Sequence, residues 1–199
     1  MTKEEKLKEI AEALKETETG LSIDEVIAYL QKNADTLRDK RSTKFLPGMY
    51  VYANGQISAE IIEGRQIVAV VGYASVERSN FAAWTQVLAV CLQEKSMDWN
   101  EAEQYCKDYA EDWVKQGKTH RPYMPSENEL RGLTENVCVI NKSLKALKAP
   151  ELSLNYAYWS SSDYNFNRKT IVLLRKGLST ALTTCESAQI RPVISLSFN

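Results

Sequence analysis

The sequence predicts an α+β protein in which an N-terminal helical hairpin, residues 1–44, precedes a larger domain of antiparallel strands and two helices, residues 45–199. The first observation is a helical period, because apolar residues recur every three or four positions in residues 7–37 and again in 99–114. The second is a set of short β-branched runs bounded by turn residues, as at 67–71 and 170–174. With 199 residues, of which 44% are hydrophobic, the chain can bury a core of ordinary size.

The first module is expected to contain two helices separated at Gly20. Ser22 and Glu25 have the spacing of a capping box at the start of the second helix. Apolar residues at positions 23, 30 and 37 keep a seven-residue step, which would favour homo-oligomerisation through residues 22–40. The alternative is a helical hairpin that packs on its own domain or acts as a spacer. The charged run ending at Lys44 is the expected boundary.

The second domain is expected to open with a β-hairpin, residues 49–52 and 56–59, around the turn Asn54-Gly55. The continuous β-branched run 67–71 predicts a central strand covered on both faces. Residues 81–92 fit a helix or a strand, and the pattern does not decide between them.

Two helices follow. Asp98 is expected to cap the longer one and Gly117 to end it, with one apolar face along it. That face comprises Trp99, Ala102, Tyr105, Cys106, Tyr109, Ala110, Trp113 and Val114. A shorter helix is expected at 127–133, capped by Ser126 with Glu129 reaching back in a capping box. The tail predicts three antiparallel strands at 170–174, 178–184 and 190–196.

Charge and composition exclude some function classes. The net charge of -1 gives no reason to expect nucleic acid or a membrane as partner, although residues 141–199 hold eight basic and three acidic residues. No apolar run approaches the roughly 20 residues of a membrane-spanning helix, and the first residues do not resemble a signal peptide. The chain as written is therefore expected in the cytoplasm, unless a leader was removed or the protein belongs to a virus particle.

The titratable residues do not predict an enzyme. His120 is the one histidine of the chain, and its neighbours predict a loop position rather than a catalytic base. No carboxylate cluster in residues 150–190 offers the six to eight oxygens that calcium takes, so neither a metal nor a cofactor is expected. Four widely spaced cysteines are expected to be buried free thiols, with disulfides as the alternative outside the cell. They are Cys91, Cys106, Cys138 and Cys185.

The order of motifs in the second half carries a family resemblance. Trp99 opens the long helix, Pro125-Ser126 precedes the short one, Tyr158-Trp159-Ser160-Ser161-Ser162 follows, and Arg191-Pro192-Val193 lies in the last strand. This order resembles the bacterial C-type-lectin-like domains at the C-terminus of Lcl-type collagen-like adhesins. It is similar, more distantly, to the formylglycine-generating fold and to retroelement-diversified variable proteins.

The resemblance covers residues 47–197 and implies a C-type-lectin-like fold with a recognition function rather than catalysis. One departure is the segment 121–125, Arg-Pro-Tyr-Met-Pro, where the family often has Trp-Arg-Leu-Pro. The calcium motifs of animal sugar-binding lectins, Glu-Pro-Asn and Trp-Asn-Asp, do not occur. Formylglycine-generating enzymes need a cysteine pair near the C-terminus, where Cys185 stands alone.

The segment 153–169 is the expected recognition surface, because its Tyr, Ser and Asn residues have the composition of a binding surface. Within it, Trp159 is expected to be a buried anchor. The candidate ligand-binding residues are Tyr156, Tyr164, Asn165, Phe166, Asn167, Arg168, Lys169, Arg175 and Lys176.

If the basic members of this set converge, a sulfated or carboxylated glycan is the expected ligand, and a solvated basic face is the alternative. The sequence thus predicts a non-catalytic domain that binds an anionic glycan. A protein-binding or structural tip of a virion or cell surface is the second hypothesis, and an enzyme of the formylglycine-generating type is the third.

Overall fold

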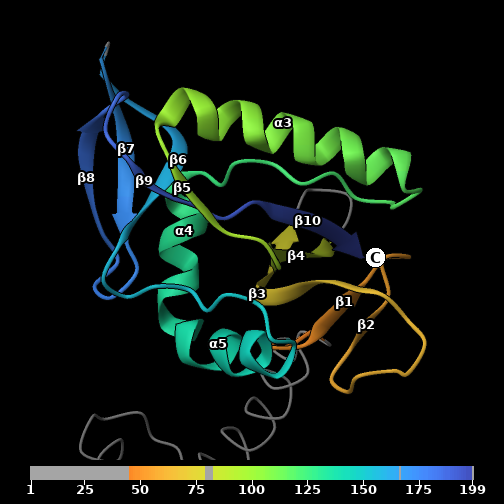
Figure 1. Ribbon diagram of the computed structural model, residues 1–199. Helices are drawn as coiled ribbons and strands as arrows, with labels where there is room; N and C mark the ends of the chain where they lie inside the picture. Colours follow the sequence, from red (N-terminus) through yellow and green to blue (C-terminus); the bar gives the residue numbers. More distant parts are fainter. Residues whose placement is uncertain (1–44, 79–82, 166, 199) are drawn as a thin grey trace, which may run out of the picture. The chain divides into compact units, whose positions relative to one another are not determined.

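Two five-stranded sheets organise the domain in the computed structural model, which describes residues 45–78, 83–165 and 167–198 (Figure 1). These residues belong to one unit, Thr43–Asn199. The expected helical hairpin and the oligomerisation segment 22–40 lie outside the described residues.

The first sheet is antiparallel throughout and has the strand order β10-β4-β3-β1-β2. Its strands are β1 Tyr50–Tyr52, β2 Ile57–Ser58, β3 Ile67–Arg78, β4 Ala83–Cys91 and β10 Val193–Phe198. The β-branched run 67–71 is the start of β3, which lies between β1 and β4 as expected for a central strand. The ambiguous segment 81–92 is a strand from Ala83 onward, because β3 and β10 flank it on both sides.

The second sheet has the order β5-β9-β6-β7-β8. Its strands are β5 Lys95–Met97, β6 Ala157–Asn165, β7 Arg168–Leu173, β8 Leu178–Thr183 and β9 Ala188–Ile190. Its pairs are antiparallel except for β6 and β9, which pair in parallel at Tyr158 and Gln189. The expectation of one antiparallel sheet with two helices is therefore wrong in detail, although the α+β class is confirmed.

Within the described part of the chain, three α-helices cover the sheets, α3 Trp99–Lys115, α4 Glu127–Leu133 and α5 Val137–Ala146, with a 3-10 turn at Thr134–Asn136. The predicted N-cap Asp98 and the predicted capping box at Ser126 are both present: Asp98 Oδ1 accepts the Glu101 amide at 2.9 Å, and Ser126 Oγ accepts the Glu129 amide at 3.3 Å. Asp98 also forms a capping box with Glu101, which was not predicted, and the capping box predicted at Ser22 lies outside the described residues. The sequence pattern did not predict α5. Its Val137, Ile140 and Leu144 are buried at helical spacing.

The core consists of three apolar clusters arranged around the sheets. One lies between the first sheet and helices α4 and α5, and includes Val70, Leu133 and Ile140. The second lies on the opposite face of that sheet and includes Trp113 of α3. The third lies between the N-terminal half of α3 and the second sheet, and it includes Cys106 of α3 and Trp159 of β6. Helix α3 therefore packs on both sheets, and in Figure 1 it runs above the first sheet, whereas α5 lies below that sheet.

The expected strand 190–196 is instead two strands in different sheets. β9 ends at Ile190 and β10 begins at Val193, so the chain changes sheet at Arg191 and Pro192. Arg191 is 1% exposed, and its Nη2 lies 3.0 Å from Glu94 Oε2 in an ion pair. The same guanidinium donates to the carbonyls of Cys91 at 2.8 Å and Pro150 at 2.6 Å. Arg191 thus fixes the crossing point between the sheets.

The predicted hairpin 49–59 is confirmed, with a different turn. β1 and β2 pair at Tyr50 with Ser58 and at Val51 with Ile57, and four residues connect them. Gly55 has a φ of 83°, whereas Asn54 does not have a positive φ, and its Oδ1 accepts the Gln56 amide at 3.1 Å. One left-handed residue suffices because the loop is longer than a two-residue turn.

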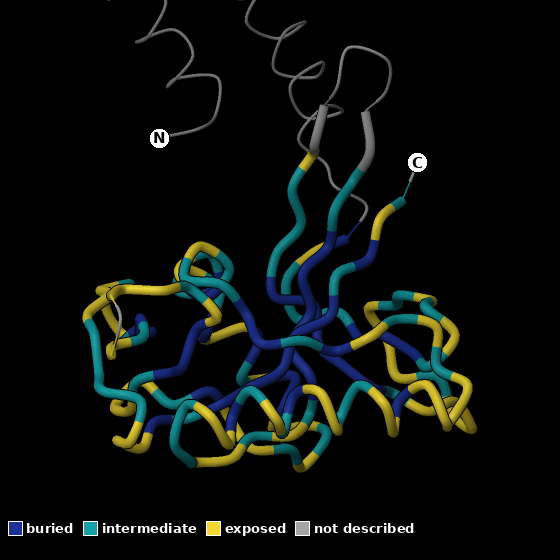
Figure 2. The backbone as a smooth tube through the Cα atoms, turned by 90° about the horizontal axis from the view of Figure 1, so that it is seen from above, coloured by how far each residue is buried: buried dark blue, intermediate teal, exposed yellow. Residues whose placement is uncertain are grey.

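The face expected to be apolar on α3 is partly solvated. Ala102, Cys106 and Trp113 are buried, but Val114 is 44% exposed. Figure 2 shows the buried segments gathered toward the middle of the domain and the exposed ones along its rim. The partly open side of α3 borders a cavity of about 470 Å³.

Candidate functional site

Two adjoining cavities run along helix α3 and form one groove. A cavity of about 470 Å³ is lined by Lys107, Ala110, Glu111, Val114, Lys115 and Arg121. A neighbouring cavity of about 450 Å³ shares Lys107 and Ala110 with the first. Its other lining residues include Trp99, Cys106, Pro122, Met124, Ser161 and Lys169. We call this continuous hollow the α3 groove.

The opposite wall of the groove is the segment 118–125, which runs back beside α3. Gly117, with a φ of 72°, reverses the chain, and the Lys118 amide donates to the Trp113 carbonyl at 3.2 Å. Tyr123 then pairs with Val193 of β10 through two backbone hydrogen bonds of 2.9 and 3.0 Å. The groove is therefore bounded by a helix and by a segment fixed to the edge of the first sheet.

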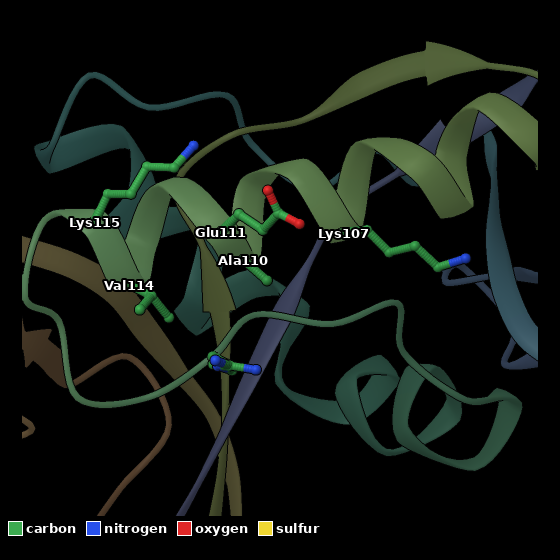
Figure 3. A pocket seen from close by; sticks show the side chains of 6 residues that line it. Lys107, Ala110, Glu111, Val114 and Lys115 are labelled. Carbon is green, nitrogen blue, oxygen red and sulfur yellow. The ribbon is translucent and has the colours of Figure 1, made fainter.

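Basic side chains occupy the outer part of the groove. Lys107 and Lys115 are eight residues apart, about 12 Å along the helix axis, with Glu111 between them (Figure 3). Each lysine has an exposed acidic neighbour on the same helix: Lys107 lies 3.2 Å from Glu103, and Lys115 lies 3.4 Å from Asp112.

Arg121 adds a third basic side chain, on the opposite wall. It is exposed, and no carboxylate of the described residues pairs with it. With respect to the described residues, the outer groove thus offers Arg121 without a carboxylate partner and two lysines in exchangeable surface pairs.

An aromatic ring and a lysine form the inner end of the groove. Lys169 Nζ lies 4.0 Å from the centroid of the Trp99 ring and pairs with Asp163. Trp99 Nε1 donates to the Ser160 carbonyl at 3.1 Å, which orients the indole. Because the Lys169 side chain is 20% exposed, its charge is held over the ring rather than freely solvated.

Burial shifts the pKa values of Cys106, Tyr123 and His120, which lie in or near the groove. Burial raises the pKa of Cys106 to about 12, so its thiol stays protonated at neutral pH. The Tyr123 hydroxyl donates to Glu129 Oε1 at 2.5 Å, and burial together with this carboxylate raises the pKa of Tyr123. His120 packs against Gly55, where an added Cβ would lie 2.9 Å from Nε2, and desolvation lowers the pKa of His120. This fits the loop position expected for the histidine.

The cysteines are free thiols, as expected, but two of them are not buried. Cys91 and Cys106 are buried, whereas Cys138 and Cys185 are exposed. Among the residues that the structure describes, no three His, Cys, Asp or Glu side chains lie together as a metal site.

The candidate residues expected from the sequence are distributed over three places. Tyr164, Asn165, Asn167 and Arg168 are exposed around the turn between β6 and β7, and Phe166 lies outside the described residues. Lys169 lies in the α3 groove, and Tyr156, 63% exposed, precedes β6.

Arg175 and Lys176 lie in the exposed turn between β7 and β8, at the other end of β7. Since β7 has six residues, about 20 Å of strand separates them from Arg168. The convergence of Arg168, Lys169, Arg175 and Lys176, which was the condition for an anionic ligand at these residues, is therefore not met. The expected buried anchor, Trp159, is 0% exposed and donates from Nε1 to the Met97 carbonyl at 2.9 Å.

The sequence pattern missed Lys107, Lys115 and Arg121 as site residues. Lys107 and Lys115 are eight residues apart in a predicted helix, so the sequence could have shown that both lie on one side of it. Arg121 carries no such signal, because its position depends on the pairing of segment 118–125 with β10.

The comparisons with known proteins bear on the fold. No protein-family model matches the chain, and no curated protein matches it. No helix among the described residues is long and apolar enough to cross a membrane. The chain is similar in structure to a fimbrial protein from Bacteroides ovatus, with a TM-score of 0.57 and 13% sequence identity. The match covers 76% of this chain and 49% of that protein, so the chain spans about half the length of its structural relative.

Proposed function

We propose that residues 45–199 are a C-type-lectin-like recognition domain that binds an acidic glycan along the α3 groove without transforming it. Support for this fold comes from the positions of the motif residues. Trp99 begins the long helix, Trp159 is a buried anchor and Arg191 is buried between the sheets. In each case the motif residue has a structural role in joining elements of the domain.

The observation that carries the proposal is the α3 groove itself, an open hollow with basic side chains on both walls. Lys107, Lys115 and Arg121 border its outer part. Exposed ion pairs such as Lys107 with Glu103 contribute only about 0–1 kcal/mol. A sulfate or carboxylate of a ligand can therefore replace the carboxylate partner at little cost.

The inner end of the groove supports a sugar ring as part of the ligand. The Trp99 ring borders the cavity, and a flat aromatic surface supplies contact area at low conformational cost. Lys169 beside it supplies a charge for an acidic substituent.

The chemistry of the groove supports binding rather than catalysis. The Cys106 thiol is protonated because burial raises its pKa to about 12. His120 packs against the β1–β2 loop at Gly55 and is not one of the groove-lining residues. The described lining therefore does not bring a nucleophile and a general base together.

The fimbrial relative supports a role in surface recognition. Its description names a fimbrial protein, and the likeness at 13% identity concerns the fold. We extend it to this chain only as a proposal that the domain serves adhesion.

The experiment is binding of the full chain to neutral, sialylated and sulfated glycans at low and moderate salt. The groove variant carries Lys107→Ala and Arg121→Ala, and the matched control carries Lys176→Ala and Arg175→Ala, so each loses one Lys and one Arg. We expect salt-sensitive binding of acidic glycans that weakens at least tenfold, or about 1.4 kcal/mol, in the groove variant only. Equal weakening in both variants, or loss in the control alone, would contradict the groove assignment.

A protein partner is the second candidate, and Val114 is the observation that favours it. This apolar side chain is 44% exposed between the charged residues of the outer groove. A groove with mixed charge and an apolar contact fits a peptide segment. If no glycan binds at either salt concentration, the glycan proposal is wrong and a peptide segment becomes the ligand to test.

A further inference from the structure

A separate pocket opens at the point where strands β6 and β9 part. These strands pair in parallel at one position, Tyr158 opposite Gln189. A cavity of about 440 Å³ lies beside that point. It is lined by Ser96, Tyr156, Ala157, Ser187, Ala188 and Gln189, and we call it the β6–β9 pocket. Its volume lies within the range typical of small-molecule sites.

The described lining of this pocket is polar and carries no charge. Ser96 and Ser187 offer hydroxyls, and Gln189 offers an amide. Each of these groups can both donate and accept a hydrogen bond. Ser96 and Gln189 are opposite each other on β5 and β9, so their side chains lie on the same face of the sheet.

An exposed tyrosine forms the rim. Tyr156 is 63% exposed, and it does not belong to any of the three apolar clusters of the described residues. The turn that carries it is well fixed, because Ser153 Oγ accepts the Asn155 amide at 3.1 Å and the Tyr156 amide at 3.2 Å.

Hydrogen bonds also connect this turn to the ion pair of Glu94 and Arg191 between the sheets. The Ser153 amide donates to the Tyr158 hydroxyl at 2.6 Å, and this hydroxyl donates to Glu94 Oε2 at 2.8 Å. Glu94 is the ion-pair partner of buried Arg191. An aromatic side chain on a pre-organised turn loses little entropy when a ligand binds to it.

We infer that the β6–β9 pocket binds a neutral pyranose ring. The apolar face of the sugar packs on the Tyr156 ring, while its hydroxyls exchange hydrogen bonds with Ser96, Ser187 and Gln189. A charged ligand would find no opposite charge in this lining and would lose solvation without compensation. The pocket is distinct from the α3 groove, and this inference does not depend on glycan binding there.

The test is a titration of the full chain with methyl glycosides of glucose, galactose, mannose and N-acetylglucosamine, followed by saturation-transfer NMR. We expect at least one glycoside to bind, with an affinity that does not change between low and high salt. Tyr156→Ala should weaken it at least tenfold, and Tyr156→Phe should keep it, because the ring makes the contact.

The matched control is Tyr164→Ala, since Tyr164 is 61% exposed and lies toward the other end of β6. Its binding should equal that of the unchanged protein. Gln189→Ala, which removes a polar group of the pocket, should weaken binding at least threefold. Absence of saturable binding up to about 50 mM glycoside, or an equal loss in Tyr164→Ala, would overturn the inference.

Discussion

Individual buried polar residues hold the two sheets together. Arg191, which follows β9, is 1% exposed and contacts Cys91 at the end of β4, Pro150 after α5 and Glu94 just before β5. A buried charge that loses its partner is not compensated by water. The sequence motif Arg-Pro-Val thus marks a joint between sheets rather than a ligand contact.

Replacing Arg191 by Ala should lower the free energy of unfolding by about 3–5 kcal/mol, because Glu94 would remain buried without its partner. Urea denaturation measures this change. Lys107→Ala, which removes an exposed pair with Glu103, should cost at most about 1 kcal/mol. Similar costs for the two variants would refute the structural role assigned to Arg191.

The four thiols should divide into two reactivity classes. Burial raises the pKa of Cys106 to about 12 and also raises that of Cys91, while Cys138 and Cys185 are exposed. At pH 8, iodoacetamide should add two groups to the folded chain and four in denaturant, as counted by mass spectrometry. Rapid modification of Cys106 in the folded protein would contradict this prediction, because it would show that the thiol is accessible from the α3 groove.

The same shifts give a pH dependence of stability. An unfolded Cys106 loses its proton near its ordinary pKa of 9.0, whereas the folded thiol keeps it to about 12. The unfolded state then binds fewer protons, so the free energy of unfolding should fall as pH rises above about 9. Replacing Cys106 by Ala should reduce this decline, which thermal melts at pH 8 and pH 10 would measure.

At the scale of elements, a glycine lets a helix approach the first sheet. Gly72 lies at the register shift in β3 between Val71 and Tyr73, and an added Cβ would come within 2.2 Å of Leu133 Cδ2 of α4. It would also lie 3.3 Å from the Leu88 carbonyl oxygen. The approach of α4 to β3 therefore requires a residue without a side chain at this position.

Gly72→Ala should destabilise the domain by about 1–3 kcal/mol, because the new methyl group overpacks the contact. Combining it with Leu133→Ala should cost less than the sum of the two single changes, since the second change removes the clashing atom. Chemical denaturation of all four proteins measures the coupling. Strict additivity would indicate that α4 does not press on β3 at Gly72.

Elements with local signals could be predicted from the sequence. The N-cap Asp98 and the capping box at Ser126 correctly predicted the starts of α3 and α4, and the pair Asn54-Gly55 predicted the β1–β2 loop. The break between β9 and β10 could not be predicted from apolar pattern, because both segments are buried runs and only long-range pairing assigns them to different sheets. Helix α5 was missed although Val137, Ile140 and Leu144 carry its period.

For the whole molecule, the candidate site combines segments that are distant in the sequence. The α3 groove takes residues from α3, from segment 118–125 and from β6 and β7. Of the expected site residues that the structure describes, Lys169 alone lines this groove. The sequence showed that the C-terminal half is basic, but it did not show that β7 separates Arg168 and Lys169 from Arg175 and Lys176. Tyr156 lies in the β6–β9 pocket, so the expected recognition surface, segment 153–169, does not form a single site.

The central claim is that the α3 groove is the recognition surface, and chemical-shift mapping tests it most directly. A sulfated oligosaccharide would be titrated into isotope-labelled protein while the amide and side-chain signals are followed. We expect saturable shifts at Lys107, Lys115, Arg121 and the Trp99 indole, with the turn at Arg175 and Lys176 unchanged. Shifts confined to that turn, or none at the groove under saturating ligand, would contradict it.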